Sequence, residues 1–154
     1  MPQLATKHFG LIEYSDEAVL EFPAGLPGFE REDRFLALEQ PGIKPVVFLQ
    51  SLKRPELCFI TLPVRVVDPD YVLSVAPEDL RVLALADDRQ PEIGREVLCL
   101  TIVSVAEDQQ TTVNLLAPIV INLKTRCAVQ AIEADSDYSH QHPLFPAGRE
   151  GPCS

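Results

Sequence analysis

Prolines recur so closely through the first two thirds of the chain that no long helix fits there. The sequence has 14 prolines among 154 residues, about twice the usual share. Nine of them stand at positions 23, 27, 41, 45, 55, 63, 69, 77 and 91. A proline inside a helix removes a backbone hydrogen bond and clashes with the preceding turn, whereas strand ends, edges and turns accept it. The pattern predicts short strands joined by turns.

A buried antiparallel core is predicted between residues 97 and 123. Val97–Val105 is apolar at almost every position, which is typical of a strand covered on both faces. The polar residues 106–110 suit a hairpin loop, and they lead to two further strand-like runs, Val113–Leu116 and Ile119–Leu123. Pro118 between these runs requires a bend, because it lacks a backbone donor.

The remaining elements complete a mainly β fold. Strands are expected at Phe9–Tyr14, Ala18–Phe22, Phe35–Leu38, Pro45–Leu52, Leu57–Leu62, Tyr71–Val75 and Cys127–Ile132. We expect the first two of these to pair with each other. One short helix is predicted to start at Pro77, since Leu80, Leu83 and Ala84 share one helical face. Such an arrangement favours a small antiparallel β-barrel, closed or partly open, because closure removes exposed strand edges.

Length and charge limit the classes of function. At 154 residues the chain fits one domain, which we place at residues 1–133, followed by a mostly flexible C-terminal tail over 134–154. The net charge of −10 argues against direct binding to nucleic acid or to an anionic membrane, because both require clustered Lys and Arg. It favours solubility or association with a basic partner. No apolar run reaches the roughly 18 residues of a membrane span, and no signal-peptide pattern begins the chain, so a cytoplasmic protein is expected.

The stretch Phe22–Glu30, FPAGLPGFE, is the strongest candidate for a binding surface. Pro27 and Gly28 fit the two central positions of a type II turn. Leu26 and Phe29 are thereby held on a stiff loop, where they either fold inward as core anchors or face outward as a contact surface. The candidate partner-binding residues are Gly25, Leu26, Pro27, Gly28, Phe29, Glu30, Asn114 and Asn122. For the two asparagines, the alternative role is to satisfy backbone groups around the bend at Pro118.

The sequence has no catalytic signature. It has no nucleophile elbow, no glycine-rich phosphate loop and no H-E-x-x-H motif. The cysteines at 58, 99, 127 and 153 fit no zinc spacing, and His140 and His142 would form only half of a metal site. We expect no enzyme activity, no cofactor and no bound metal. The alternative is a split barrel that binds a small ligand or cofactor, with or without enzyme activity.

Two motifs in the same order carry a family resemblance. Phe22–Glu30 followed by Phe35, and Thr112–Asn122 followed by Gln130, resemble the flagellar assembly factor FliW family. The resemblance covers about Phe9 to Leu144, nearly the whole chain.

The resemblance implies a non-catalytic, monomeric β-barrel of the bacterial cytoplasm. Proteins of this family bind flagellin before its export, and they bind CsrA, a small RNA-binding repressor of flagellin translation. When flagellin is depleted, the factor is released to antagonise CsrA. An acidic surface fits the second partner, since an RNA-binding protein presents basic surface.

Overall fold

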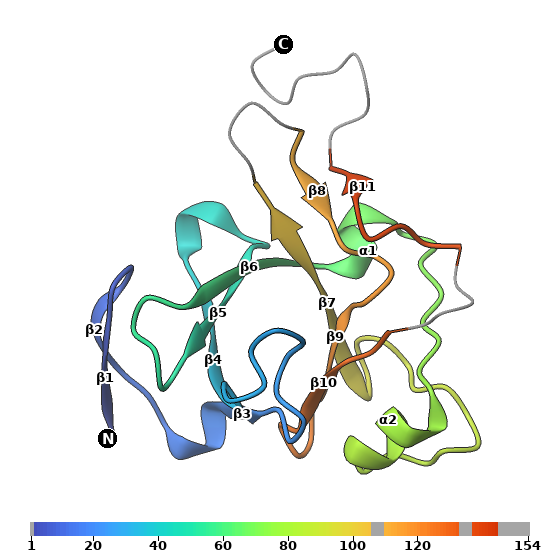
Figure 1. Cartoon of the computed structure of the whole chain (residues 1–154), viewed down its shortest axis with the longest axis horizontal. Helices are drawn as coiled ribbons and strands as arrows, with labels where there is room; N and C mark the ends of the chain where they lie inside the picture. Colours follow the sequence, from blue (N-terminus) through green and yellow to red (C-terminus); the bar gives the residue numbers. More distant parts are fainter. Residues whose placement is uncertain (1, 106–109, 133–136, 145–154) are drawn as a thin grey trace.

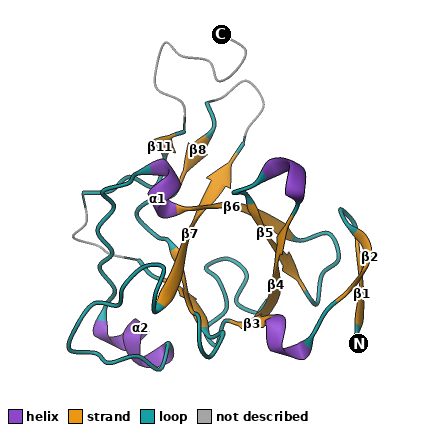
Figure 2. Ribbon diagram, turned by 180° about the vertical axis from the view of Figure 1, so that it is seen from behind, coloured by secondary structure: helices purple, strands orange, loops and turns teal. Residues whose placement is uncertain are grey.

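A computed structural model of the chain describes residues 2–105, 110–132 and 137–144, and it is built mainly from β-strands (Figure 1). The strands are β1 Gln3–Thr6, β2 Gly10–Glu13, β3 Val19–Glu21, β4 Arg34–Glu39, β5 Val47–Ser51, β6 Cys58–Pro63, β7 Val97–Ser104, β8 Thr112–Val113, β9 Ile119–Asn122, β10 Ala128–Gln130 and β11 His142–Pro143. The helices are α1 Val64–Val67 and α2 Pro77–Val82, with short 3-10 turns at Asp16–Ala18 and Pro41–Ile43. Figure 2 shows these short helical segments placed around the outside of the strands. The prediction of a mainly β fold is confirmed.

Seven strands form a barrel in the order β10-β9-β7-β6-β5-β4-β3, and every neighbouring pair is antiparallel. The two ends of this order meet at a single bridge between Glu21 and Cys127. There the Glu21 N–H donates to the Arg126 carbonyl over 3.0 Å. The ring of strands is visible in Figure 1, with β3 beside β10. The predicted antiparallel barrel is confirmed, and so are the strands at Val97–Val105 and Ile119–Leu123, whereas the predicted run Val113–Leu116 is a strand only over Thr112–Val113.

The barrel side formed by β7, β9 and β10 is buried on both faces. Its inward side chains join the barrel interior, made of Leu20, Phe22, Leu26, Phe35, Val47, Leu49, Leu100, Ile119, Ile121 and Ala128. Its outward side chains join a second core, made of Leu62, Val64, Tyr71, Leu73, Val75, Leu80, Leu83, Val97, Cys99, Val113, Leu115, Val120, Val129 and Ala131. The apolar run in β7 is explained by this double burial, as the sequence predicted.

The predicted pairing of Phe9–Tyr14 with Ala18–Phe22 is wrong. β2 pairs with β1 instead, and β3 pairs with β4. The Thr6 hydroxyl closes the tight β1–β2 turn, donating to the Gly10 carbonyl over 2.8 Å and accepting from the Phe9 N–H over 2.9 Å. The 3-10 turn at Asp16–Ala18, capped by Ser15, then leads the chain out of the hairpin and into the barrel.

Residues 62–85 cover the outer face of β7, β9 and β10 in a way the sequence only partly predicts. The helix starting at Pro77 is confirmed, but Ala84 lies past its end, exposed and at φ 60°. Helix α1 was not expected. The predicted strand Tyr71–Val75 does not form, because side chains satisfy its backbone: Gln90 bonds both the N–H (2.7 Å) and the carbonyl (3.0 Å) of Val75.

Part of the predicted C-terminal tail, residues 137–144, contacts the strands of the domain. β11 pairs with β8, and the Leu144 N–H donates to the Thr111 carbonyl over 3.0 Å. The Tyr138 ring stacks on Tyr71 with centroids 4.4 Å apart. Residues 137–144 therefore pack on the domain, because the side chains of Tyr138 and Leu144 contact the second core. Residues 134–136 and 145–154 of the predicted tail lie outside the described residues.

Candidate protein-binding site

The loop between β3 and β4 is closed by its own backbone. The Phe22 N–H donates to the Asp33 carbonyl over 2.8 Å, and the Gly25 N–H donates to the Phe22 carbonyl over 2.8 Å. At the tip, the Phe29 N–H donates to the Leu26 carbonyl over 2.7 Å. Figure 1 shows this loop within the ring of strands. A loop with so many internal bonds keeps one shape, which lowers the entropy cost of binding.

Glycines make this shape possible. Gly28 has φ +84°, as the third residue of a type II turn requires, so the turn predicted at Pro27–Gly28 is confirmed. Gly25 has φ +67°, and a Cβ there would lie 2.5 Å from the Glu30 carbonyl oxygen. No side chain fits at position 25, because the two halves of the loop touch there.

Leu26 and Phe29 take the inward alternative. Leu26 is 2% exposed and lies in the barrel interior. Phe29 is half-buried, with its ring edge-to-face against Phe59 at 5.5 Å. Leu26 therefore fills the barrel interior and presents almost no surface of its own. Pro27, Gly28 and Glu30 remain exposed at the surface.

Asn114 and Asn122 also take the structural alternative. The Asn114 Oδ1 accepts from the Ala117 N–H over 2.9 Å. Asn122 is 3% exposed; its amide donates to the Leu83 carbonyl over 2.7 Å, and its Oδ1 accepts from the Lys124 N–H over 2.9 Å. Each therefore has the backbone-bonding role that the sequence also allows, through Oδ1 in Asn114 and through both amide atoms in Asn122.

A small notch opens beside the loop, between the loop and helix α2. Its volume is about 250 Å³, and it is lined by Ala24, Gly25, Pro27, Glu30, Asp79, Val82, Val129 and Gln130. We call it the loop–helix notch. Burial raises the pKa of the Asp79 carboxyl above its ordinary value, and the neighbouring charge of Glu78 adds to this.

The sequence predicts only the loop side of this notch. Asp79 lies in the first turn of α2 and Val82 is its last residue, and no local sequence pattern indicates that they face residues 24–30. Their proximity depends on the Glu21–Cys127 bridge that brings β3 to β10. Gln130, which contributes to the resemblance, also lines the notch, and its amide donates to the Ala117 carbonyl over 3.1 Å.

A second hollow lies on the other side of the loop. It has a volume of about 350 Å³ and is lined by Gly28, Phe29, Glu30, Arg31, Glu32 and Arg54. Glu32 is 8% exposed and accepts from the Ser51 hydroxyl over 3.0 Å. The Arg54 side chain lies 3.0 Å from Glu56 and 4.0 Å from Glu32. Within this hollow, the charges of Glu32 and Arg54 already have partners in the chain.

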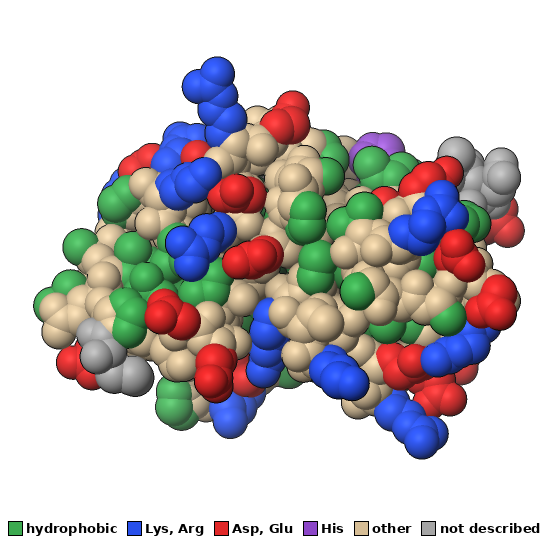
Figure 3. Space-filling model, turned by 90° about the horizontal axis from the view of Figure 1, so that it is seen from below, with side chains coloured by type: hydrophobic (Ala, Val, Ile, Leu, Met, Phe, Trp, Pro, Cys, Tyr) green, Lys and Arg blue, Asp and Glu red, His purple; other side chains and the backbone are tan. Residues whose placement is uncertain are grey.

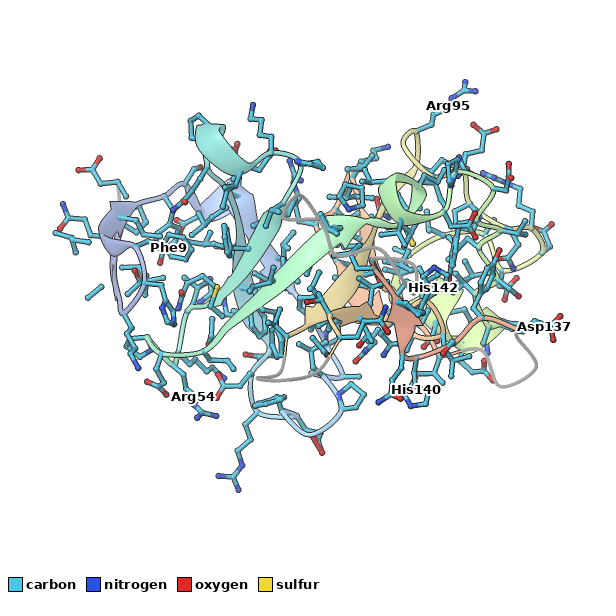
Figure 4. All side chains as sticks on the ribbon, turned by 90° about the horizontal axis from the view of Figure 1, so that it is seen from above. Phe9, Arg54, Arg95, Asp137, His140 and His142 are labelled. Carbon is cyan, nitrogen blue, oxygen red and sulfur yellow. The ribbon has the colours of Figure 1, made fainter. Side chains whose placement is uncertain are left out.

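Histidines and cysteines are the side chains that a metal site or a reactive thiol would use. Over residues 2–105, 110–132 and 137–144, no group of three or more His, Cys, Asp and Glu is placed to hold a metal ion. Figure 4 shows His140 and His142 on the segment around β11. Burial raises the pKa of the Cys58 thiol to about 11 and that of the Cys99 thiol to about 12, so both stay protonated and unreactive near neutral pH. Cys153 lies outside the described residues.

Within the described part of the chain, none of the helices combines the length and apolar character needed to cross a bilayer. The underside, on which β3, β10 and α2 lie, shows acidic, basic and hydrophobic side chains intermixed (Figure 3). Fold and surface together define a class: a small, mainly antiparallel β-barrel with an interior filled by side chains and with small hollows on its surface.

The comparisons with known proteins agree with this class. The model of the family described as "FliW protein" matches residues 3–144. The flagellar assembly factor FliW of Syntrophomonas wolfei is 36% identical over 137 residues, covering 88% of this chain and 84% of that protein. The one from Heliobacterium modesticaldum is 35% identical over 146 residues, covering 94% and 92%. The chain belongs to the FliW family.

A solved structure shows the same fold. The crystal structure of a flagellar assembly factor FliW superimposes with a TM-score of 0.83 at 32% sequence identity, covering 96% of this chain and all of that chain. The family model, which matches through residue 144, includes β11.

Proposed function

We propose that this protein is a non-catalytic flagellar assembly factor of the bacterial cytoplasm, which binds flagellin and CsrA in alternation. Flagellin occupies the protein while it awaits export. When flagellin is depleted, the protein binds CsrA and relieves its repression of flagellin translation. The observation that carries the proposal is the family match over residues 3–144.

The filled barrel interior supports protein binding over the small-ligand alternative. Phe22 and Phe35 are 0% exposed, and Leu26 is 2% exposed. The Phe22 and Phe35 rings meet edge-to-face at 5.4 Å. These side chains occupy the space that a ligand-binding barrel would leave open. The surface, rather than the interior, is then where this protein meets its partners.

Charge supports CsrA as one of the two partners. The chain carries 23 acidic and 13 basic residues, whereas a protein that binds RNA phosphates presents clustered Lys and Arg. Complementary charge speeds encounter between proteins and selects among partners. We therefore expect the affinity for CsrA to fall as ionic strength rises from about 50 mM to about 500 mM, because the Debye screening length shortens about threefold over that range. A flat salt response would remove charge pairing from the proposal.

Titration calorimetry tests the proposal directly. The protein is titrated with flagellin, with CsrA, and with each partner in the presence of the other. We expect binding to both partners and a loss of affinity for CsrA once flagellin is bound. Simultaneous binding with unchanged affinities would contradict the alternation, and absence of binding to either partner would contradict the function.

Oligomeric state gives an independent check. We propose a monomer, and light scattering after gel filtration should give a mass near 17.0 kDa for the free protein. A mass twice as large would mean that part of the surface described above is covered by a second copy.

A further inference from the structure

We propose that the loop–helix notch receives one Lys or Arg side chain from the basic surface of CsrA. The identity of that partner rests on the proposed function. The location and the chemistry rest on the notch itself. The inference therefore assigns to one hollow of the surface a specific kind of occupant.

Three elements of the chain build the notch. The loop after β3 contributes one wall, α2 contributes the opposite wall, and β10 contributes the base. Five of its eight lining residues are small or apolar, namely Ala24, Gly25, Pro27, Val82 and Val129. The others are Glu30, Asp79 and Gln130. The notch is thus an apolar slot with two carboxylates and an amide.

The walls are fixed in place. The close approach of Gly25 to the backbone of Glu30 sets the loop wall. On the other side, the Cys127 thiol lies 3.1 Å from the Val82 carbonyl and ties the end of α2 to the start of β10. A slot that is already formed loses little entropy when a side chain enters it.

Its charge is negative and unbalanced. No Lys or Arg is among the lining residues, and neither Glu30 nor Asp79 pairs through its side chain with any residue in the described part of the chain. The nearest cation along α2, Arg81, is held by Asp87 at 2.9 Å. Burial, and after it the nearby charge of Glu78, raises the pKa of Asp79, which agrees with a carboxylate that has no cationic partner. An incoming Lys or Arg side chain would supply a partner for the two carboxylates.

Size and surface select a long cationic side chain. The volume of about 250 Å³ lies below the usual range for small-molecule sites, which begins near 300 Å³. Lys and Arg carry an aliphatic stem that packs on apolar surface while the charged end meets a carboxylate. Pro27, Val82 and Val129 can contact the stem, and Glu30 and Asp79 the charge. The second hollow, which shares Glu30 with the notch, is lined by Arg31 and Arg54 and so suits a cation less well.

Charge removal with a matched control tests the notch. The variant Glu30→Gln/Asp79→Asn removes both carboxylates and keeps their shape. The control Glu39→Gln/Asp70→Asn removes two exposed carboxylates that line none of the hollows described here. Both variants have the same net charge, so any general loss of electrostatic attraction during association with CsrA is the same in both. Binding to CsrA is measured by surface plasmon resonance, and folding by thermal melting.

The expected result is a difference between the two variants in the dissociation rate. Loss of two partly exposed ion pairs should weaken CsrA binding on the order of tenfold for the notch variant, mainly through faster dissociation. The control should change the affinity less than about threefold, through slower association. A third variant, Val82→Trp, fills the slot without changing charge and should also speed dissociation. If a variant loses binding and also melts at a lower temperature, the affinities are compared at a temperature at which all variants are folded. This comparison separates a defect in binding from a defect in folding.

Each other outcome overturns the inference in a distinguishable way. If the original protein does not bind CsrA, the proposed function fails and the notch assignment fails with it. If it binds CsrA but the notch and control variants behave alike, only the notch assignment fails. If the notch variant loses flagellin and keeps CsrA, the notch serves the other partner and the assignment is again wrong.

Discussion

The two sides of the barrel are built in different ways. The side of β7, β9 and β10 is apolar on both faces, with Leu100 at 0% exposure inside and Val120 at 0% outside. On the side of β3 to β6 the outer face is only partly covered: Ile60 is 39% exposed, and Phe48 is covered by Phe9 of the β1–β2 hairpin at 5.2 Å (Figure 4).

This difference places the candidate site. The loop–helix notch lies at the seam where the two sides meet, next to the Glu21–Cys127 bridge. Its loop wall follows β3, from the thinner side, whereas α2 belongs to the layer that covers the thicker side. A rigid scaffold thus supports the notch from both directions, and the candidate surface does not depend on the exposed hairpin.

The largest expected effect contrasts the same residue type on the two sides. Ile121 is 1% exposed and Ile60 is 39% exposed. Ile121→Ala leaves a cavity in a closely packed interior and should lower the free energy of unfolding by about 3–4 kcal/mol, whereas Ile60→Ala should cost less than about 1 kcal/mol. Urea unfolding followed by circular dichroism measures both. Equal losses would mean that the two sides do not differ in packing as described.

A second comparison separates the inside of the loop from its outside. Leu26→Ala should lower the free energy of unfolding by about 3 kcal/mol, because Leu26 is a core residue at 2% exposure. Pro27→Ala, at an exposed position one residue later, should cost less than about 1 kcal/mol. The same urea experiment checks both variants. If Leu26→Ala unfolds with unchanged stability, the loop does not plug the barrel.

A third comparison tests the backbone approach that shapes the notch. Gly25 and Gly28 both have positive φ, so alanine strains either one. Only at Gly25 would the new Cβ meet backbone, at 2.5 Å, while at Gly28 nothing lies within 4 Å. We expect Gly25→Ala to cost about 2 kcal/mol or more and Gly28→Ala about 1 kcal/mol. Thermal melting ranks them, and the reverse ranking would contradict the loop geometry.

Local chemistry explains which features could be predicted from the sequence. The turn at Pro27–Gly28 and the helix starting at Pro77 follow from residues next to each other in the chain, and both are confirmed. The strand β7 could be predicted because the residues on both of its faces are mostly apolar. For Leu26, Asn114 and Asn122, the sequence permits two roles, since a side chain that leaves a turn points inward or outward according to contacts made elsewhere.

Features that depend on distant contacts could not be predicted. The notch joins residues 24–30 to 79–82 and 129–130, and nothing in any of the three segments indicates the other two. Likewise, the polar character of residues 134–144 hides Tyr138, whose partner Tyr71 lies far away in the sequence. Barrel closure and the outer layer create these contacts, so only the folded chain displays them.

The smallest expected effect concerns this C-terminal segment. The Tyr138 hydroxyl accepts a hydrogen bond from the Val72 N–H over 2.9 Å, and its ring stacks on Tyr71. Tyr138→Phe removes only the hydroxyl and should lower the free energy of unfolding by about 1 kcal/mol. Tyr138→Leu serves as the companion variant, because it also removes the stacked ring and should cost more. If neither substitution changes the urea midpoint, residues 137–144 contribute no stability to the barrel, and the domain ends functionally before them. A graded loss would show instead that this short segment holds the outer layer against the thicker side, on which α2 and one wall of the notch depend.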